Sequence, residues 1–326
     1  MKRPIARLLI EWYQRIRRDL PWRRSSDPYR IWVSEIMLQQ TRAQAVIPYY
    51  ERFLQRFPTI EALAAAPEDQ VLALWSGLGY YSRARNLHRA AQAVAQAGGF
   101  PREYDSIRAL PGIGDYTAAA VASIAFGLPH AVLDGNVLRV VARVENDAAD
   151  IAAPRTRERF RAIAQEWLDR RRAGEFNQAL MELGATVCLP KNPQCAECPL
   201  ERLCRARSAG TTAQLPVKLR RKEPVHISSV LLVVQNRGRV LLRRREASAR
   251  RMAGFWELPE AAHAPGARVG KYHGTFRHTI THHRYTIEVK AAKWTPGGGD
   301  FAWFTPSELA AIPLSTTARK ALALIL

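Results

Sequence analysis

Two carboxylates stand in settings suited to acid–base chemistry. Glu35 lies in a predicted helix that runs through residues 31–41, among mostly apolar neighbours such as Ile31 and Trp32. Burial on that face would raise its pKa and let it hold a proton near neutral pH, whereas an ordinary exposed helix glutamate would not. Asp134 immediately precedes an apolar-periodic helix, where it can serve simply as the N-cap. A capping carboxylate is also held rigidly, so it can aim its free oxygen at a cation on a sugar.

The four cysteines of the chain provide the strongest local pattern. They share one short window with the spacing C-x6-C-x2-C-x5-C: Cys188, Cys195, Cys198 and Cys204. In a reducing compartment, such a cluster indicates metal binding rather than disulfides. Four-cysteine zinc sites usually use two tight C-x2-C pairs, and only one occurs here. Zinc and an iron–sulfur cluster both remain open on this spacing.

The sequence LPGIG at 110–114 is similar to the hairpin of a helix-hairpin-helix element. Gly112 and Gly114 would let backbone N–H groups approach a DNA phosphate at the start of the next helix, where the helix dipole favours an anion. A short P-G-x-G sequence is also a common turn with no ligand.

Composition narrows the class of partner. The chain of 326 residues has 49 Lys and Arg against 29 Asp and Glu, for a formal net charge of +20. This excess favours a polyanion such as nucleic acid, although membrane surfaces share the signature. No apolar run is long enough to cross a bilayer, and residues 1–18 lack a signal-peptide core. We therefore expect a soluble cytoplasmic protein, associated with the nucleoid if bacterial, with no membrane role and no obligate oligomer, hence a monomer.

Periodicity predicts two domains. Apolar residues recur at helical spacing over 3–187, and Asp27 with Pro28 makes a good helix start. Residues 1–207 are therefore predicted to be an all-α domain that includes the loop 188–204. Residues 208–225 are basic and rich in small residues, as in a linker. Residues 226–326 are predicted to be α+β, with strands over 225–235, 240–246, 269–276 and 284–294 and helices over 306–312 and 316–326.

Several spaced segments together resemble the MutY adenine DNA glycosylases of the helix-hairpin-helix superfamily. They are LPWR at 20–23, WVSEIMLQQT at 32–41, GLGYYSRARNL at 77–87, LPGIG at 110–114, LDGNV at 133–137, FNQALMELGA at 176–185 and the four cysteines. The resemblance spans essentially the whole chain. It implies an all-α helix-hairpin-helix glycosylase domain with a 4Fe-4S cluster loop, followed by an α+β Nudix-like domain that recognises 8-oxoguanine.

The resemblance also implies a monofunctional enzyme that hydrolyses the N-glycosidic bond of adenine paired with 8-oxoguanine or guanine in double-stranded DNA. An endonuclease III-like enzyme for oxidised pyrimidines is one alternative, but it uses a lysine after the hairpin to form a Schiff base. Tyr116 stands there and cannot form the imine. A non-catalytic damage-binding protein is the other alternative, and Glu35 and Asp134 argue against it. Some relatives carry a lysine where this chain has Leu138, so we expect little covalent trapping.

Residue roles follow from the same resemblance. Glu35 would protonate N7 of adenine and Asp134 would stabilise the sugar cation, with Tyr116 and Asn136 nearby. The adenine pocket would be lined by Trp22, Arg23, Leu38 and Gln178. Gln40 and Tyr80 would wedge into the duplex, with Thr41 and Leu78 close to 8-oxoguanine.

In the second domain, residues 276–283 resemble the loop with which the family detects 8-oxoguanine. The usual Phe-Ser-His stands here as Ile280, Thr281 and His282. Thr281 keeps the hydroxyl and His282 the ring, whereas Ile280 lacks an aromatic face for stacking. A solvated strand-end histidine is the alternative for His282. The glutamate-rich metal box of Nudix hydrolases is missing, so we expect a binding module without hydrolase activity.

Overall fold

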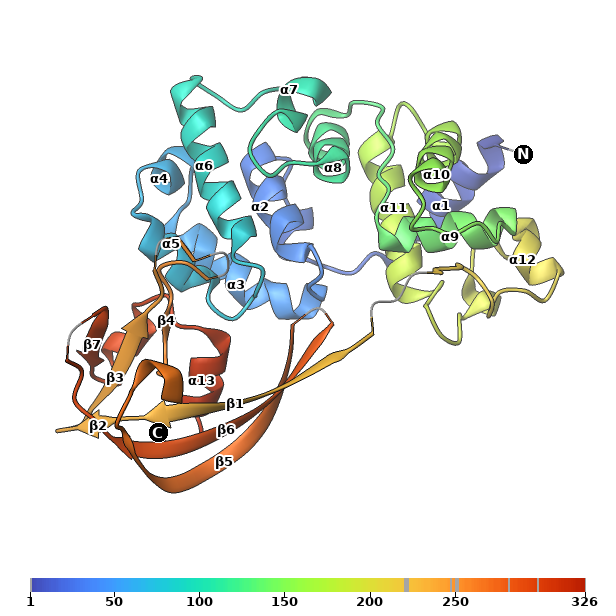
Figure 1. The fold of residues 1–326 in the computed structure, drawn as a ribbon. Helices are drawn as coiled ribbons and strands as arrows, with labels where there is room; N and C mark the ends of the chain where they lie inside the picture. The colour runs from blue at the N-terminus through green and yellow to red at the C-terminus, as the bar shows by residue number, and fades with distance from the viewer. Residues whose placement is uncertain are drawn as a thin grey trace. The chain divides into compact units, whose positions relative to one another are not determined.

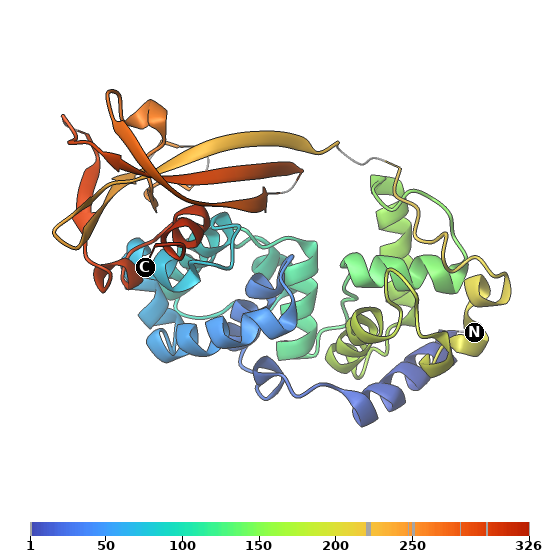
Figure 2. The ribbon, with the colours of Figure 1, turned by 90° about the horizontal axis from the view of Figure 1, so that it is seen from below.

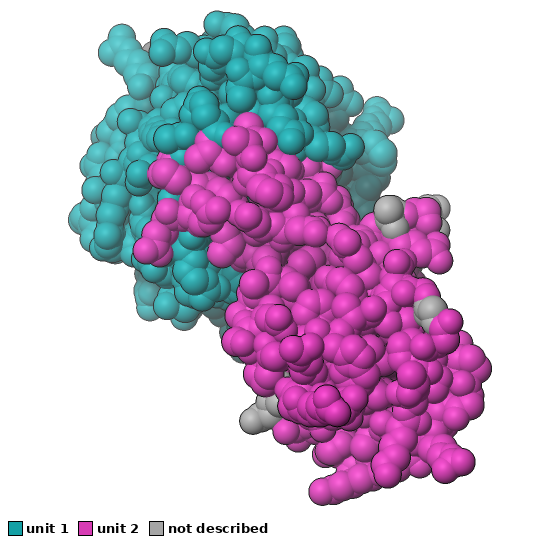
Figure 3. Space-filling view, turned by 90° about the vertical axis from the view of Figure 1, so that its left-hand side faces the viewer, with its two compact units in different colours: residues 1–54, 59–61, 89–221 teal, residues 55–58, 62–88, 222–326 magenta. Residues whose placement is uncertain are grey.

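The computed structural model describes residues 2–219, 223–246, 248–249, 252–280, 282–297 and 299–325. The chain forms two compact units (Figure 3). Unit 1 comprises residues 1–54, 59–61 and 89–221, and unit 2 comprises residues 55–58, 62–88 and 222–326. The segment 62–88 therefore belongs with the C-terminal residues, although it lies within the predicted helical domain in sequence.

The first two thirds of the chain are helical, as predicted (Figure 1). The α-helices are α1 Lys2–Ile16, α2 Pro28–Leu38, α3 Ala43–Arg56, α4 Ile60–Ala64, α5 Glu68–Trp75, α6 Ser82–Gln96, α7 Tyr104–Arg108, α8 Asp115–Phe126, α9 Gly135–Glu145, α10 Pro154–Trp167, α11 Ala173–Thr186 and α12 Arg205–Ser208. Short 3-10 helices occur at η1 Pro21–Arg23, η2 Cys195–Glu197 and η3 Glu201–Leu203. No helix of the described residues is long and apolar enough to cross a membrane.

Helix α2 begins where the sequence predicts it and ends earlier than expected. The side chain of Asp27 accepts a hydrogen bond from the Tyr29 backbone N–H at 2.8 Å, and Pro28 occupies the first turn. The helix stops at Leu38, since Gln40 adopts a left-handed backbone with φ of 57°. Gln40 therefore lies on a turn instead of the helix face that the sequence suggested.

Helix α1 packs against α10 and α11, which lie far away in sequence (Figures 1 and 2). Their shared core also takes in α8 and α9 and contains Leu9, Tyr13, Val141, Phe160 and Phe176, all at most 1% exposed. Burial of such apolar area is the main stabilising contribution to a helical unit. It packs together α8, α9 and α11, which carry Tyr116, Asn136 and Gln178 of the site described below.

The C-terminal residues of unit 2 form two sheets. In one, β1 Val225–Val233 pairs in parallel with β6 His283–Lys293, and β6 pairs antiparallel with β5 Arg268–Ile280. In the other, β3 Arg239–Arg244 pairs antiparallel with β2 Gln235–Asn236, β4 Trp256–Glu257 and β7 Phe301–Phe304. The four predicted strands are present; β2, β4 and β7 were not predicted. The remaining elements are η4 Ala261–His263, η5 Glu308–Ala310 and α13 Thr316–Leu322.

Two predictions at the C-terminal end need correction. The helix expected over 306–312 is only the 3-10 turn η5, and α13 ends at Leu322 before the predicted limit of 326. Ser315 caps α13 by accepting from the Ala318 N–H at 3.1 Å.

The first part of the linker predicted over 208–225 packs on unit 1, where the Ile151 N–H donates to the carbonyl of Val217 at 3.0 Å.

Candidate active site

A pocket of about 670 Å³ opens in unit 1, between η1, the end of α2, and the faces of α8, α9 and α11. This volume suits a small ligand such as a single nucleobase with its sugar. Ten of the predicted site residues line it: Trp22, Arg23, Glu35, Leu38, Gln40, Thr41, Tyr116, Asp134, Asn136 and Gln178. Residues from five separate segments of the sequence thus meet around one space.

Glu35 is buried on α2, with only 5% of its surface exposed. The hydroxyl of Tyr116 donates a hydrogen bond of 2.6 Å to its Oε2. Burial is the largest influence and raises the pKa of Glu35 to about 7; the Tyr116 bond lowers it and the charge of Asp134 raises it. The carboxyl group therefore gains or loses its proton near neutral pH, as a general acid must.

Asp134 is the N-cap of α9 and faces the same pocket. Its Oδ1 accepts from the Val137 N–H at 2.8 Å and its Oδ2 from Nδ2 of Asn136 at 3.0 Å. Burial raises the pKa of Asp134, while the hydrogen bonds from Val137 and Asn136 lower it. Hydrogen bonds to fixed donors favour the ionised form. The capping role and a role in the pocket are thus compatible in this one side chain.

A buried arginine links Asn136 to the cysteine loop. Arg139 donates from Nε to the carbonyl of Cys188 at 2.7 Å and from Nη2 to Oδ1 of Asn136 at 2.8 Å and the carbonyl of Gly184 at 2.7 Å. Gly184 lets α11 lie close to Asn136, since a Cβ at position 184 would stand 2.6 Å from the Cβ of Asn136. The amide of Asn136 is therefore oriented with its nitrogen toward Asp134.

The four cysteines converge on one small cavity whose other walls are mostly apolar, including Val140, Val144, Leu183 and Val187. Arg143 donates from Nη1 to Sγ of Cys188 at 3.3 Å. Thiolates are the preferred ligands of iron–sulfur clusters and of zinc. Within the described part of the chain, no three His, Cys, Asp or Glu side chains form a group that could hold a single metal ion. Four thiols around one cavity are nevertheless the donor set that a metal cluster needs.

Sequence reasoning missed an ion-pair network in the pocket wall. Glu182 is 1% exposed and accepts from Arg18 Nε and Nη2 and from Arg23 Nη2, each at 2.7 Å. Burial alone would raise the pKa of Glu182, but hydrogen bonds and charges from Arg18 and Arg23 lower it to about 2. The positions 178, 181, 182 and 185 recur at helical spacing and all line the pocket. Extending the predicted Gln178 along that face would have found Glu182.

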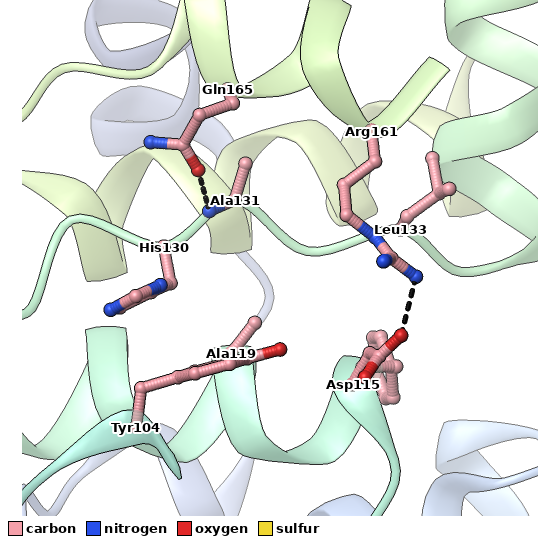
Figure 4. Close-up of a pocket in the computed structure, with 9 residues that line it drawn as sticks. Tyr104, Asp115, Ala119, His130, Ala131, Leu133, Arg161 and Gln165 are labelled. Carbon is pink, nitrogen blue, oxygen red and sulfur yellow. Dashed lines mark hydrogen bonds and ion pairs between the residues drawn. The ribbon is translucent and has the colours of Figure 1, made fainter. Parts of the chain in front are cut away.

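The predicted hairpin lies at the start of α8. Gly112 has φ of 75°, the left-handed region that favours glycine, whereas Gly114 is the N-cap of α8 and has open space where a Cβ would stand. Beside them, Asp115 pairs with Nη2 of Arg161 at 2.7 Å (Figure 4) and with Nε of Arg108 at 2.6 Å. The two arginines outweigh the one carboxylate, so an anion could approach this helix start.

Three of the predicted substrate-contacting residues lie outside this pocket's lining. Leu78 and Tyr80 belong to unit 2, where Tyr80 is 42% exposed on a turn with φ of 49°. His282 lies between β5 and β6, with its ring centroid 4.1 Å from that of His283. The prediction for Thr281 falls outside the described residues.

Comparison with known proteins identifies the family. Residues 33–168 match the HhH-GPD superfamily of base excision DNA repair proteins, and residues 229–324 match the NUDIX domain. An adenine DNA glycosylase of Homo sapiens is 34% identical over 396 aligned residues, covering 96% of this chain and 72% of that protein. The chain belongs to the adenine DNA glycosylases. Base excision repair activity on adenine follows, as does the helical glycosylase domain with a Nudix-like domain after it.

Further relatives of this glycosylase agree. Adenine DNA glycosylase of Buchnera aphidicola subsp. Baizongia pistaciae (strain Bp) is 38% identical, covering 73% of this chain and 68% of that one. The Mus musculus enzyme is 47% identical over 64% of this chain, which spans only 42% of it. Among solved structures, a thermostable thymine-DNA glycosylase is 29% identical with a TM-score of 0.57, covering 63% of this chain and 95% of that one. A non-covalent endonuclease III–DNA complex, at 23% identity and a TM-score of 0.54, covers 64% of this chain and 98% of that one and shares the fold.

Proposed function

We propose that this glycosylase hydrolyses the N-glycosidic bond of adenine paired with 8-oxoguanine or guanine in duplex DNA, without nicking the strand. The observation that carries the mechanism is Glu35, buried in a pocket beside Asp134 with a pKa of about 7. The adenine nucleotide must first leave the base stack to reach such a pocket. The remaining pocket residues, among them Trp22 and Gln178, would surround the extruded base.

The reaction would use the two carboxyl groups in different protonation states. Protonated Glu35 donates its proton to N7 of adenine, so the base departs neutral as the bond between C1′ and the base breaks. The electron pair of that bond stays with adenine and leaves a cation on the sugar, which ionised Asp134 stabilises. Water then adds to C1′, and its proton can return to the Glu35 carboxylate. Tyr116, which has no amine, supports hydrolysis rather than Schiff-base chemistry.

We also propose that the Nudix-like module recognises 8-oxoguanine through Thr281 and His282 and lacks hydrolase activity. Two glutamates lie in the segment where a Nudix hydrolase would carry its metal-binding glutamates, and both already make other contacts. Glu257 pairs with Arg243 at 3.1 Å and Arg245 at 2.9 Å, and the side chain of Glu260 caps η4. Paired carboxylates are poor candidates for a free metal-binding array.

For the cysteine cavity we propose a 4Fe-4S cluster held by Cys188, Cys195, Cys198 and Cys204. Such a cluster would order the loop between α11 and α12, and the excision mechanism contains no redox step for it. Analysis of the purified protein should find about four iron atoms and four sulfides per chain. Zinc without sulfide would contradict the proposal.

The net charge of +20 supports duplex DNA as the partner. We propose a cytoplasmic monomer as the working state, and sedimentation of the purified protein tests whether it is a monomer.

The substrate proposal is tested on duplexes with adenine opposite 8-oxoguanine, adenine opposite guanine, and an oxidised pyrimidine, each with and without alkali. Cleavage at adenine only after alkali is expected. Alkali-independent nicking at the oxidised pyrimidine alone would favour an endonuclease III-like activity instead.

A further inference from the structure

The turn that carries Leu78 and Tyr80 is stiff for its length. Gly77, Gly79 and Tyr80 all have positive φ, of 110°, 74° and 49°. Arg83 donates from Nη2 to the carbonyls of Leu78 at 3.4 Å and Gly79 at 3.2 Å, and its guanidinium lies 5.5 Å from the centroid of the Tyr80 ring. These contacts fix the shape of the turn, so its position is set by the residues that hold its two ends.

Both ends are held by the C-terminal residues of unit 2. Directly before the turn, buried Ser76 donates from Oγ to the carbonyl of Leu314 at 2.7 Å and accepts from Nη2 of Arg319 at 2.8 Å. Directly after the turn, the hydroxyl of Tyr81 lies 3.2 Å from Oγ1 of Thr316. The Tyr81 ring also packs on Phe255, with a centroid distance of 4.1 Å.

The partners of Ser76 and Tyr81 are parts of the module's own framework. Leu314 bridges to Trp256 of β4, and Ser315 donates its N–H to the Trp256 carbonyl at 2.9 Å. Thr316 and Arg319 lie on α13, whose Ala318 is fully buried in the core of the module. A shift of β4 or α13 would therefore be transmitted to the turn 77–80 through side chains that are already in contact.

We propose that Ser76 and Tyr81 are positioning residues through which the Nudix-like module sets the position of Leu78 and Tyr80. The inference rests on the proposed function, in which the module recognises 8-oxoguanine, and on the role that the family resemblance implies for Leu78 and Tyr80 at the lesion. In that setting, recognition by the module and insertion of the turn are one coupled event. The preference for 8-oxoguanine over guanine opposite adenine then depends on the contacts of Ser76 and Tyr81 as well as on His282.

The test compares single-turnover excision of adenine opposite 8-oxoguanine with excision opposite guanine. Arg319→Ala removes one hydrogen bond and should slow excision opposite 8-oxoguanine by about fivefold. Ser76→Ala removes that bond and the bond to Leu314, so it should slow excision opposite 8-oxoguanine at least as much. Both should leave excision opposite guanine nearly unchanged. The double variant should lose little more than Ser76→Ala alone, because the bond between the two side chains is already absent there. Arg319→Lys should restore part of the preference. Arg268→Ala, which removes an exposed arginine of the same module, is the matched control.

Tyr81→Phe keeps the ring on Phe255 and removes the hydroxyl, which contacts Thr316 at 3.2 Å and accepts from the Gly77 N–H at 3.3 Å. It should fold and show the same selective loss. Equal slowing on both duplexes, or an unchanged preference in all three single variants, would overturn the inference. The wild-type protein distinguishes failure of the recognition proposal from failure of this inference. If it excises adenine equally fast opposite both bases, the proposed recognition of 8-oxoguanine by the module fails and this inference with it. If wild type and variants all keep the preference, only the inference fails.

Discussion

The hydroxyl of Tyr116 lies 2.6 Å from Oε2 of Glu35 and donates a hydrogen bond to it. This bond joins α8, which begins at the predicted DNA-binding hairpin, to α2, which carries the proposed acid. Burial favours neutral Glu35 and the hydrogen bond favours its ionised form, and the balance puts its pKa at about 7. The protonation state of one side chain therefore connects stability, pH and catalysis in this protein.

Glu35→Gln should stabilise the fold at neutral and alkaline pH. The folded-state pKa of Glu35 is raised from 4.5 to about 7, so ionisation destabilises the folded protein as pH rises through that window. The variant cannot ionise, and its advantage over wild type should grow by up to about 3 kcal/mol between the two pKa values. Denaturant unfolding at several pH values measures this. If the difference in free energy of unfolding between variant and wild type shrinks as pH rises, burial does not raise the pKa of Glu35.

Tyr116→Phe should move the pH dependence of excision to higher pH. The lost hydrogen bond favours the ionised carboxylate, so its removal raises the pKa of Glu35 further, and the acid stays protonated at higher pH. The alkaline midpoint of the single-turnover rate should rise by about one pH unit. Tyr104→Phe, a change across the neighbouring small cavity (Figure 4), should leave the midpoint in place. A downward shift in Tyr116→Phe would reverse the assigned sign of this hydrogen bond.

Arg139→Lys should slow excision without loss of the proposed 4Fe-4S cluster from the cysteine loop. Lysine cannot reproduce the fork that joins Cys188, Gly184 and Asn136, and Asn136 would no longer be oriented toward Asp134. The rate per cluster-containing molecule should fall at least about tenfold, as expected for a lost charged hydrogen bond.

Arg143→Lys is the matched control for that variant. Arg143 donates to Leu189 and Leu215 carbonyls but to no atom of Asn136. It should lower cluster content or stability more than the rate per loaded molecule. Equal rate losses in both variants would show that Arg139 has no special link to Asp134.

His282→Ala should weaken the preference for 8-oxoguanine while leaving the chemistry intact. We expect the ratio of excision rates opposite 8-oxoguanine and guanine to fall about tenfold, the effect of about one good hydrogen bond to a base. His226→Ala, at an exposed position on β1, serves as the control. An equal loss on both duplexes would leave His282 as a structural strand-end residue.

Much of the fold was predictable because its signals are local. Asp27 with Pro28 predicted the start of α2, and Asp134 predicted the cap of α9, since each cap needs only neighbouring residues. The end of α2 was placed too late because the left-handed turn at Gln40 has no glycine to mark it. Strand β7 is short and its four residues are all partly buried, so it shows no alternation of buried and exposed positions to predict it.

The candidate site was predictable wherever one residue could be judged alone. The apolar neighbours of Glu35 indicated its burial, and the structure has it 5% exposed. Helical spacing from Gln178 could have placed Glu182 on the pocket face, but its pairing with Arg18, 164 positions away, leaves no local pattern. The same applies to the segment 62–88, whose membership of unit 2 depends on contacts such as that of Ser76 with Leu314. Long-range pairings of this kind require the folded structure.

In the proposed mechanism, Glu35 delivers the proton that releases adenine. The most direct measurement is single-turnover excision of adenine opposite 8-oxoguanine by wild type and Glu35→Gln across pH 5 to about 9. Wild type should lose activity as pH rises past about 7, where Glu35 ionises, and Glu35→Gln should be slower by about a hundredfold or more at every pH. Normal excision by Glu35→Gln, with wild-type pH dependence, would show that another group supplies the proton.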